Sequence, residues 1–130
     1  MMLLPAAVLV IVVLGALAVD VAVVHLGERQ AFGAATAAAN DAATYGIDPS
    51  TLRSGGGPSI DPARARHAAR ASLAGEDSLD PDAAPVVRID GTSVTVTVTL
   101  RVEYVFSQGL PGAPDSTTVM AQATADAVQR

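Results

Sequence analysis

Few residues of this chain have side chains that could do chemistry, and the most informative of them is an aspartate inside an apolar segment. Asp20 follows the uncharged stretch from Leu3 to Val19, and ionisable groups in such segments tend to be paired or functional. Two interpretations are open. The carboxylate of Asp20 lies in the lipid headgroup zone, or it faces an arginine or an amino terminus of another subunit. His25 lies about 140° around a helix from Asp20, so these two residues are poor partners.

Glu28 and Arg29 end the apolar stretch, and together with Asp20 they are candidates for a membrane boundary or an assembly contact. The spacing of Asp77, Asp80 and Asp82 faintly resembles a calcium loop. It lacks the central glycine and the terminal glutamate of an EF-hand, so a solvated connector is the expectation. The chain shows no nucleophile with a base at useful spacing, no histidine pair and no carboxylate pair in an apolar setting. We therefore expect that the protein is not an enzyme and that it binds no metal ion and no cofactor.

The composition narrows the classes of partner. The chain has 130 residues and a net charge of −5, and its 8 basic residues, all arginine, form no cluster. Binding of nucleic acid or of anionic lipid through a polybasic patch is therefore not expected, and nothing indicates a small-molecule substrate. Cysteine is absent, which excludes disulfides, cysteine-ligated zinc and thiol catalysis.

The apolar start predicts a membrane anchor over residues 1–26. The stretch from Leu3 to Val19 covers roughly 25 Å as a helix, a little less than the ~30 Å hydrocarbon core, and extension to Leu26 makes up the difference. The alternative is a cleaved signal peptide with Ala16-Leu17-Ala18 as its cleavage motif, but no basic region precedes the apolar run. We favour a retained single-pass anchor in the inner or plasma membrane, contacting lipid, with the remainder extracytoplasmic.

Residues 27–46 predict a continuation of the same helix as a stalk. The stretch from Ala31 to Ala43 is dominated by small residues, and Gly46 followed by Asp48-Pro49 predicts the end of the helix. Such a helix would be about 65 Å long, twice the bilayer core. Its small residues either permit close helix packing or simply favour helix formation. Whether that surface meets its own domain or a neighbour is open.

Residues 47–130 predict a small α+β domain. Asp61-Pro62 opens a second helix that ends at Gly75, with Ala65, Ala69 and Leu73 on its buried stripe. Short apolar runs with period two then predict three antiparallel strands: Pro85 to Ile89, Val94 to Phe106 with alternate residues on one buried face, and Thr117 to about Ala125. We expect the sheet to be covered by the second helix and by the outer part of the first.

The sequence resembles the TadE/TadG-like proteins of tight-adherence (Flp-type) pilus systems. The matching pieces are Leu4-Pro5, Ala18-Val19-Asp20-Val21, and Glu28-Arg29-Gln30 leading into Ala34 to Ala39. Thr36 stands where the family pattern has aspartate, and Ala31 stands where it has leucine. The order of helix, valine/threonine strand and Ala-Thr-Ala final strand is similar too.

This resemblance implies a pilin-like fold and a membrane-anchored structural or accessory protein, a pseudopilin or minor pilin, in Flp/Tad-type pilus assembly or secretion. Its partners would be other pilus-assembly or pilin-like subunits, met through the N-terminal helix. Prepilin processing is not expected, because no basic leader ending in glycine opens the apolar run. The alternative function is a small secreted or anchored binding module of the cell envelope.

Overall fold

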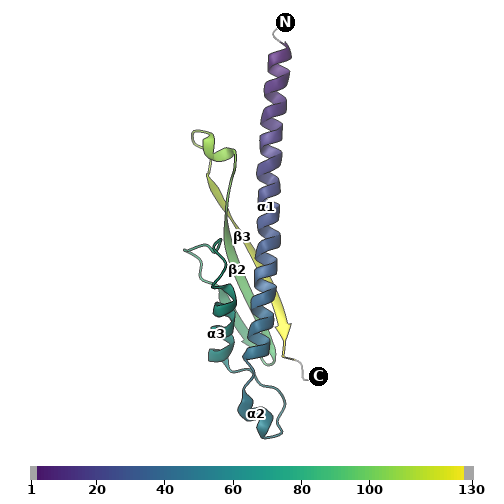
Figure 1. Cartoon of the computed structure of the whole chain (residues 1–130), viewed down its shortest axis with the longest axis vertical. Helices are drawn as coiled ribbons and strands as arrows, with labels where there is room; N and C mark the ends of the chain where they lie inside the picture. The colour runs from purple at the N-terminus through teal and green to yellow at the C-terminus, as the bar shows by residue number, and fades with distance from the viewer. Residues whose placement is uncertain (1–2, 128–130) are drawn as a thin grey trace.

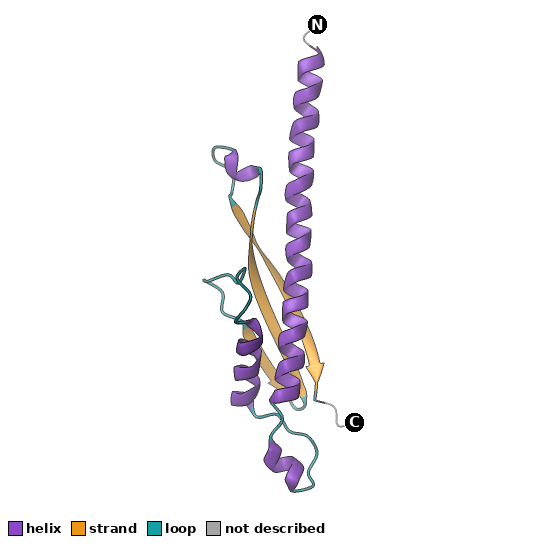
Figure 2. Cartoon of the chain, viewed as in Figure 1, coloured by secondary structure: helices purple, strands orange, loops and turns teal. Residues whose placement is uncertain are grey.

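The computed structural model describes residues 3–127, and one long helix runs along a three-stranded sheet (Figures 1 and 2). The α+β architecture expected from the sequence is confirmed. The elements in chain order are α1 (Leu3–Tyr45), α2 (Pro49–Arg53), α3 (Pro62–Leu73), β1 (Val86–Asp90), β2 (Ser93–Glu103), the 3₁₀ turn η1 (Ser107–Gly109) and β3 (Ser116–Asp126).

The sheet has the order β1-β2-β3, and both pairings are antiparallel. Alternation along β2 sends five side chains into the core, four of them without exposed surface: Val94, Val96, Val98, Leu100 and Val102. Strand β3 presents smaller residues on the same face, with Val119 buried. The dipeptide Asp90-Gly91 is typical of a two-residue hairpin turn and predicts one here. Asp90 instead pairs with Ser93, so the turn between β1 and β2 is Gly91-Thr92, one residue later.

The central strand ends earlier than the sequence predicts. Alternation of apolar residues suggested that the buried face continues through Phe106, but β2 stops at Glu103 and Phe106 is 49% exposed. The physical reason is a competing acceptor. The backbone N–H groups of Val105 and Phe106 donate to the carboxylate of Asp20, so they are not available for a strand ladder.

The C-terminal half of α1 is part of the domain rather than a free stalk. It packs on β2, β3 and α3 through a stripe of small residues without exposed surface: Ala31, Ala35, Ala38, Ala39 and Ala42. Alanine side chains let the helix backbone come close to the sheet, and they occupy helical positions at no cost in propensity. The sequence did not show whether the small-residue surface of α1 packs on its own domain or on a neighbour. The structure shows that it packs on the chain's own sheet.

The remaining helices begin at aspartates. Asp61 accepts hydrogen bonds from the N–H groups of Ala63 and Arg64 at the start of α3, as the Asp-Pro pair predicts. Helix α2 was not expected. Asp48 caps it by accepting from the hydroxyl and the N–H of Ser50, and these bonds lower the pKa of Asp48 below its ordinary value.

Helix α1 ends at Tyr45 as predicted, but Gly46 does not adopt the left-handed conformation of a terminating glycine. A Cβ at this position would lie 2.3 Å from the carbonyl oxygen of Ala42 and 2.8 Å from the Cβ of Ala65. Glycine is therefore required by the last turn of α1 and by the close approach of α3.

Candidate membrane anchor and the Asp20 site

The N-terminal part of α1 projects beyond the sheet (Figure 1). Its large apolar side chains are exposed. Leu3 is 85% exposed, Ile11 69% and Leu14 60%. The helix is long and apolar enough to cross a membrane. We call the stretch from Leu3 to Val19 the exposed apolar segment. Side chains of this size are normally buried in a soluble domain, so the segment is more stable in an apolar environment than in water.

Asp20 lies at the point where this segment meets the domain, and it is 4% exposed. Its Oδ1 accepts from the backbone N–H of Val105 at 2.8 Å and of Phe106 at 3.0 Å. Its Oδ2 accepts from the N–H of Ser107 at 3.0 Å and from the Ser107 hydroxyl. We call this arrangement the Asp20 site. An ionised carboxylate has enough lone pairs for all four donors, so the side chain acts as a clamp on the loop.

The structure gives Asp20 a partner that neither interpretation of the sequence named. Its carboxylate binds the β2–β3 loop (residues 104–115) of the same chain. Beyond Asp20 one side of α1 is covered, because Val23 and Val24 pack against the core and Gly27 is buried. The fully uncovered helix therefore ends at Val19, short of the boundary at Leu26 that hydropathy predicts.

The two other boundary candidates lie outside the Asp20 site. Glu28 and Arg29 are both exposed on α1. The Oε2 of Glu28 lies 3.2 Å from the Nδ1 of His25, one helical turn away, and both side chains are exposed. Exposed pairs of this kind contribute little to stability. The structure therefore brings Glu28 together with His25 and brings neither Glu28 nor Arg29 to Asp20.

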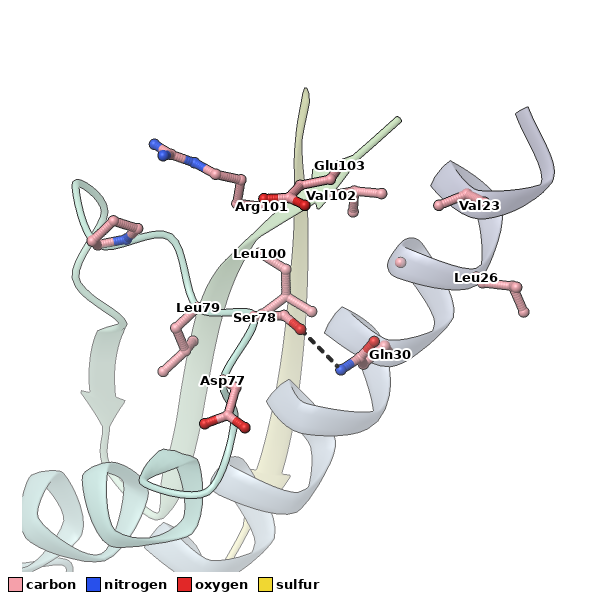
Figure 3. Close-up of a pocket in the computed structure, with 12 residues that line it drawn as sticks. Val23, Leu26, Gln30, Asp77, Ser78, Leu79, Leu100, Arg101, Val102 and Glu103 are labelled. Carbon is pink, nitrogen blue, oxygen red and sulfur yellow. Dashed lines mark hydrogen bonds between the residues drawn. The ribbon is translucent and has the colours of Figure 1, made fainter. Parts of the chain in front are cut away.

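A cleft of about 500 Å³ lies between α1 and the loop before β1 (Figure 3). Gln30 crosses it, donating to the Oε1 of Glu76 at 2.7 Å and to the Ser78 hydroxyl at 3.4 Å. At its floor α1 approaches β2 so closely that a Cβ on Gly27 would lie 2.4 Å from the Cγ2 of Val102. The hydrogen bonds of Gln30 tie α1 to the loop before β1, and the close approach at Gly27 packs α1 on the sheet.

In the loop from Glu76 to Asp82, which we call the acidic connector, two carboxylates lie around the guanidinium group of an arginine. The Nη2 of Arg101 lies 3.1 Å from a carboxylate oxygen of Asp80 and 3.1 Å from one of Asp82. The N–H of Asp80 also donates to the carbonyl of Thr99, which adds the connector to the edge of β2. Within residues 3–127, no three histidine or acidic side chains are placed to hold a metal ion.

Sequence reasoning singled out Asp20 and missed its partners. One signal was available: Asp20, Val24, Gly27 and Ala31 follow the helical i, i+4, i+7, i+11 spacing, so the aspartate belongs to the stripe that packs on the domain. Nothing in the sequence pointed to the loop amides. No known protein family, curated protein or solved structure matches this chain, so the TadE/TadG-like resemblance stays an expectation.

Proposed function

We propose that this chain is a membrane-anchored, pilin-like structural or accessory protein of Flp/Tad-type pilus assembly or secretion. One observation carries the proposal: a single helix has an uncovered apolar end and an opposite end built into the core of a small sheet. Such a helix can hold the domain at a membrane and also present an apolar surface to neighbouring helices. The proposal assigns no catalytic step to the chain.

The helix supports a retained anchor over a cleaved signal peptide. Helix α1 runs unbroken through Ala16 and Ala18, the two alanines of the cleavage motif that a signal peptide would use. The exposed apolar segment is also continuous with the helix that packs on the sheet, so the anchor and the domain form one piece. The chain has no basic cluster after the exposed apolar segment, so the positive-inside rule gives no reason to keep the domain in the cytoplasm. We therefore place the domain outside the cytoplasm, with α1 crossing the inner or plasma membrane once.

Deletion of the gene in the source organism tests this function. We expect loss of assembled pili from the sheared surface fraction and reduced surface adherence, both restored by the wild-type gene. The complementing protein should fractionate with membranes. Intact pilus assembly and adherence in the deletion strain would overturn the proposal. Genes for a secretion ATPase and a pilus platform beside this one would support it.

A binding module is the second candidate, and the uncovered face of the sheet favours it. On β3 this face consists of exposed side chains: Thr118, Met120, Gln122, Thr124 and Asp126. The hydroxyl groups of Thr95 on β2 and Thr124 on β3 are hydrogen-bonded at 2.8 Å on this face. A pull-down with the full chain distinguishes the candidates. A discrete partner that is lost on Gln122→Arg substitution, without any pilus defect in the deletion strain, would favour the binding module.

A further inference from the structure

The β2–β3 loop has an unusual surface for a loop. The run from Tyr104 to Pro114 contains no charged residue. Three of its large apolar side chains point into solvent, with Val105 50%, Phe106 49% and Leu110 61% exposed. A loop that only connects two strands in water has no need for three exposed apolar side chains close together.

The height of this loop along α1 is fixed. The Asp20 site ties the N–H groups of Val105, Phe106 and Ser107 to the helix just where the exposed apolar segment ends. Leu17 lines one groove together with Tyr104, Ser107 and Pro114. Figure 1 shows the loop at the end of the sheet nearest the N-terminal part of α1, which continues past it. The apolar loop therefore lies beside the end of the exposed apolar segment.

The backbone of the loop is suited to a place with little water. Besides the three N–H groups held by Asp20, those of Tyr104, Gly109, Leu110 and Ala113 donate to carbonyl oxygens at its base or within it. Pro111 and Pro114 have no N–H group. Paired or missing donors remove most of the cost of taking a backbone out of water.

We propose that the β2–β3 loop is a second membrane contact. Val105, Phe106 and Leu110 enter the interfacial zone of the same bilayer that α1 crosses, on the side of the domain. This inference rests on the proposed anchoring of α1. Two contact points define an orientation that a single helix leaves free: the helix fixes the height of the domain, and the loop fixes its rotation about the helix and its tilt. The Asp20 carboxylate holds the two contacts together.

Single-tryptophan fluorescence tests this inference, because the chain contains no tryptophan. The full chain is reconstituted into phosphatidylcholine vesicles with lipids brominated either near the headgroup or deep in the acyl chain. Phe106→Trp reports on the loop, and Leu110→Trp repeats the measurement in case the first variant folds poorly. Met120→Trp, on the polar face of the sheet and 71% exposed, is the matched control. Leu9→Trp reports independently on the anchor.

We expect Phe106→Trp and Leu110→Trp to show blue-shifted emission, quenched more by the shallow bromine than by the deep one. Met120→Trp should keep the emission of a water-exposed indole and show no quenching. Leu9→Trp should be quenched most by the deep bromine. Quenching of Leu9→Trp without quenching of the loop variants would overturn the loop contact and leave the anchor intact. A blue shift of the loop without quenching would mean that protein covers it, which also overturns the inference. No quenching of Leu9→Trp would overturn the anchor itself.

Discussion

The two halves of α1 reverse the usual relation between side-chain size and burial. In the exposed apolar segment, leucine, valine and isoleucine side chains stand uncovered, whereas the alanines from Ala31 to Ala42 on the packing stripe have no exposed surface. Large apolar side chains release the most free energy on burial, so a soluble domain would use them in its core. If α1 is the anchor that we propose, the large side chains meet lipid, while the small ones set the distance between helix and sheet.

Arginine substitution should give the largest difference between the two halves of α1, measured as loss of membrane association. Leu9→Arg combined with Val12→Arg places two charges in the exposed apolar segment, at a cost of roughly 2.5–3.5 kcal/mol each at the centre of a membrane helix. We expect the protein to leave the membrane fraction while its domain stays folded. Phe32→Arg combined with Tyr45→Arg, at exposed positions of the other half, is the control and should leave membrane association unchanged. Equal loss of membrane association in the two double variants would show that the two halves of α1 do not differ in this role.

The junction between the halves depends on Asp20. Asp20→Ala removes the acceptor of three backbone N–H groups. We expect their hydrogen-exchange protection to fall by roughly tenfold or more, since a bond to a charged group is among the stronger hydrogen bonds. The measurement is amide exchange at residues 105–107. Glu28→Ala changes an exposed carboxylate on the same helix and should have no effect. Unchanged protection in Asp20→Ala would show that the loop is held by other contacts.

Enlarging a side chain on the packing stripe tests the role of small residues. Ala39→Leu adds three carbons where no surface is exposed, and overpacking of this kind costs about 1–3 kcal/mol. Ala37→Leu makes the same change on the exposed side of the helix and should stay within about 0.5 kcal/mol. Leucine and alanine have similar helix propensities, so the difference between the variants reports packing. Denaturant unfolding measures it, and equal stabilities would contradict the close-packing argument.

The contrast between the halves explains what the sequence could and could not predict. The helix ends, the capping of α3 by Asp61 and the alternation of Val94, Val96 and Val98 are local signals, because a few neighbouring residues determine them. The resulting α+β class follows from combining those signals. The exposed apolar segment is likewise visible as an uncharged run.

The Asp20 site could not be predicted in the same way, because its partners lie 85 to 87 residues along the chain. Its donors are backbone amides, which every residue except proline carries, so no side-chain pattern marks them. The early end of β2 has the same cause: valine and phenylalanine at positions 105 and 106 suit a strand, and only the carboxylate of Asp20 takes their N–H groups away. Helix α2 was missed because a helix of 5 residues leaves no periodic signal.

Glycine at the closest approach of helix and sheet gives a smaller effect. Gly27→Ala would place its Cβ 2.4 Å from the Cγ2 of Val102, which can shift toward the neighbouring cleft. Gly33→Ala has open space at the same helix and should stabilise the protein by about 0.5–1 kcal/mol, since alanine is the better helix former. We expect Gly27→Ala to lose that gain and to be about 1 kcal/mol less stable than Gly33→Ala. Equal stabilisation of both variants in denaturant unfolding would show that the close approach of α1 to β2 does not require glycine at position 27.

Acid should affect the two regions unequally, and this is the smallest effect we expect. The segment from Leu3 to Val19 contains no titratable side chain, so its membrane association should not change with pH. In the domain, hydrogen bonds from Ser50 lower the pKa of Asp48 in the folded state. A lowered pKa adds stability that is fully present above the ordinary value of about 3.9 and is lost as the pH falls through the lower folded value. Unfolding curves of the wild type and of Asp48→Asn should therefore differ above about pH 4 and converge in stronger acid. A difference that persists unchanged in acid would mean that the charge of Asp48 does not contribute to the cap.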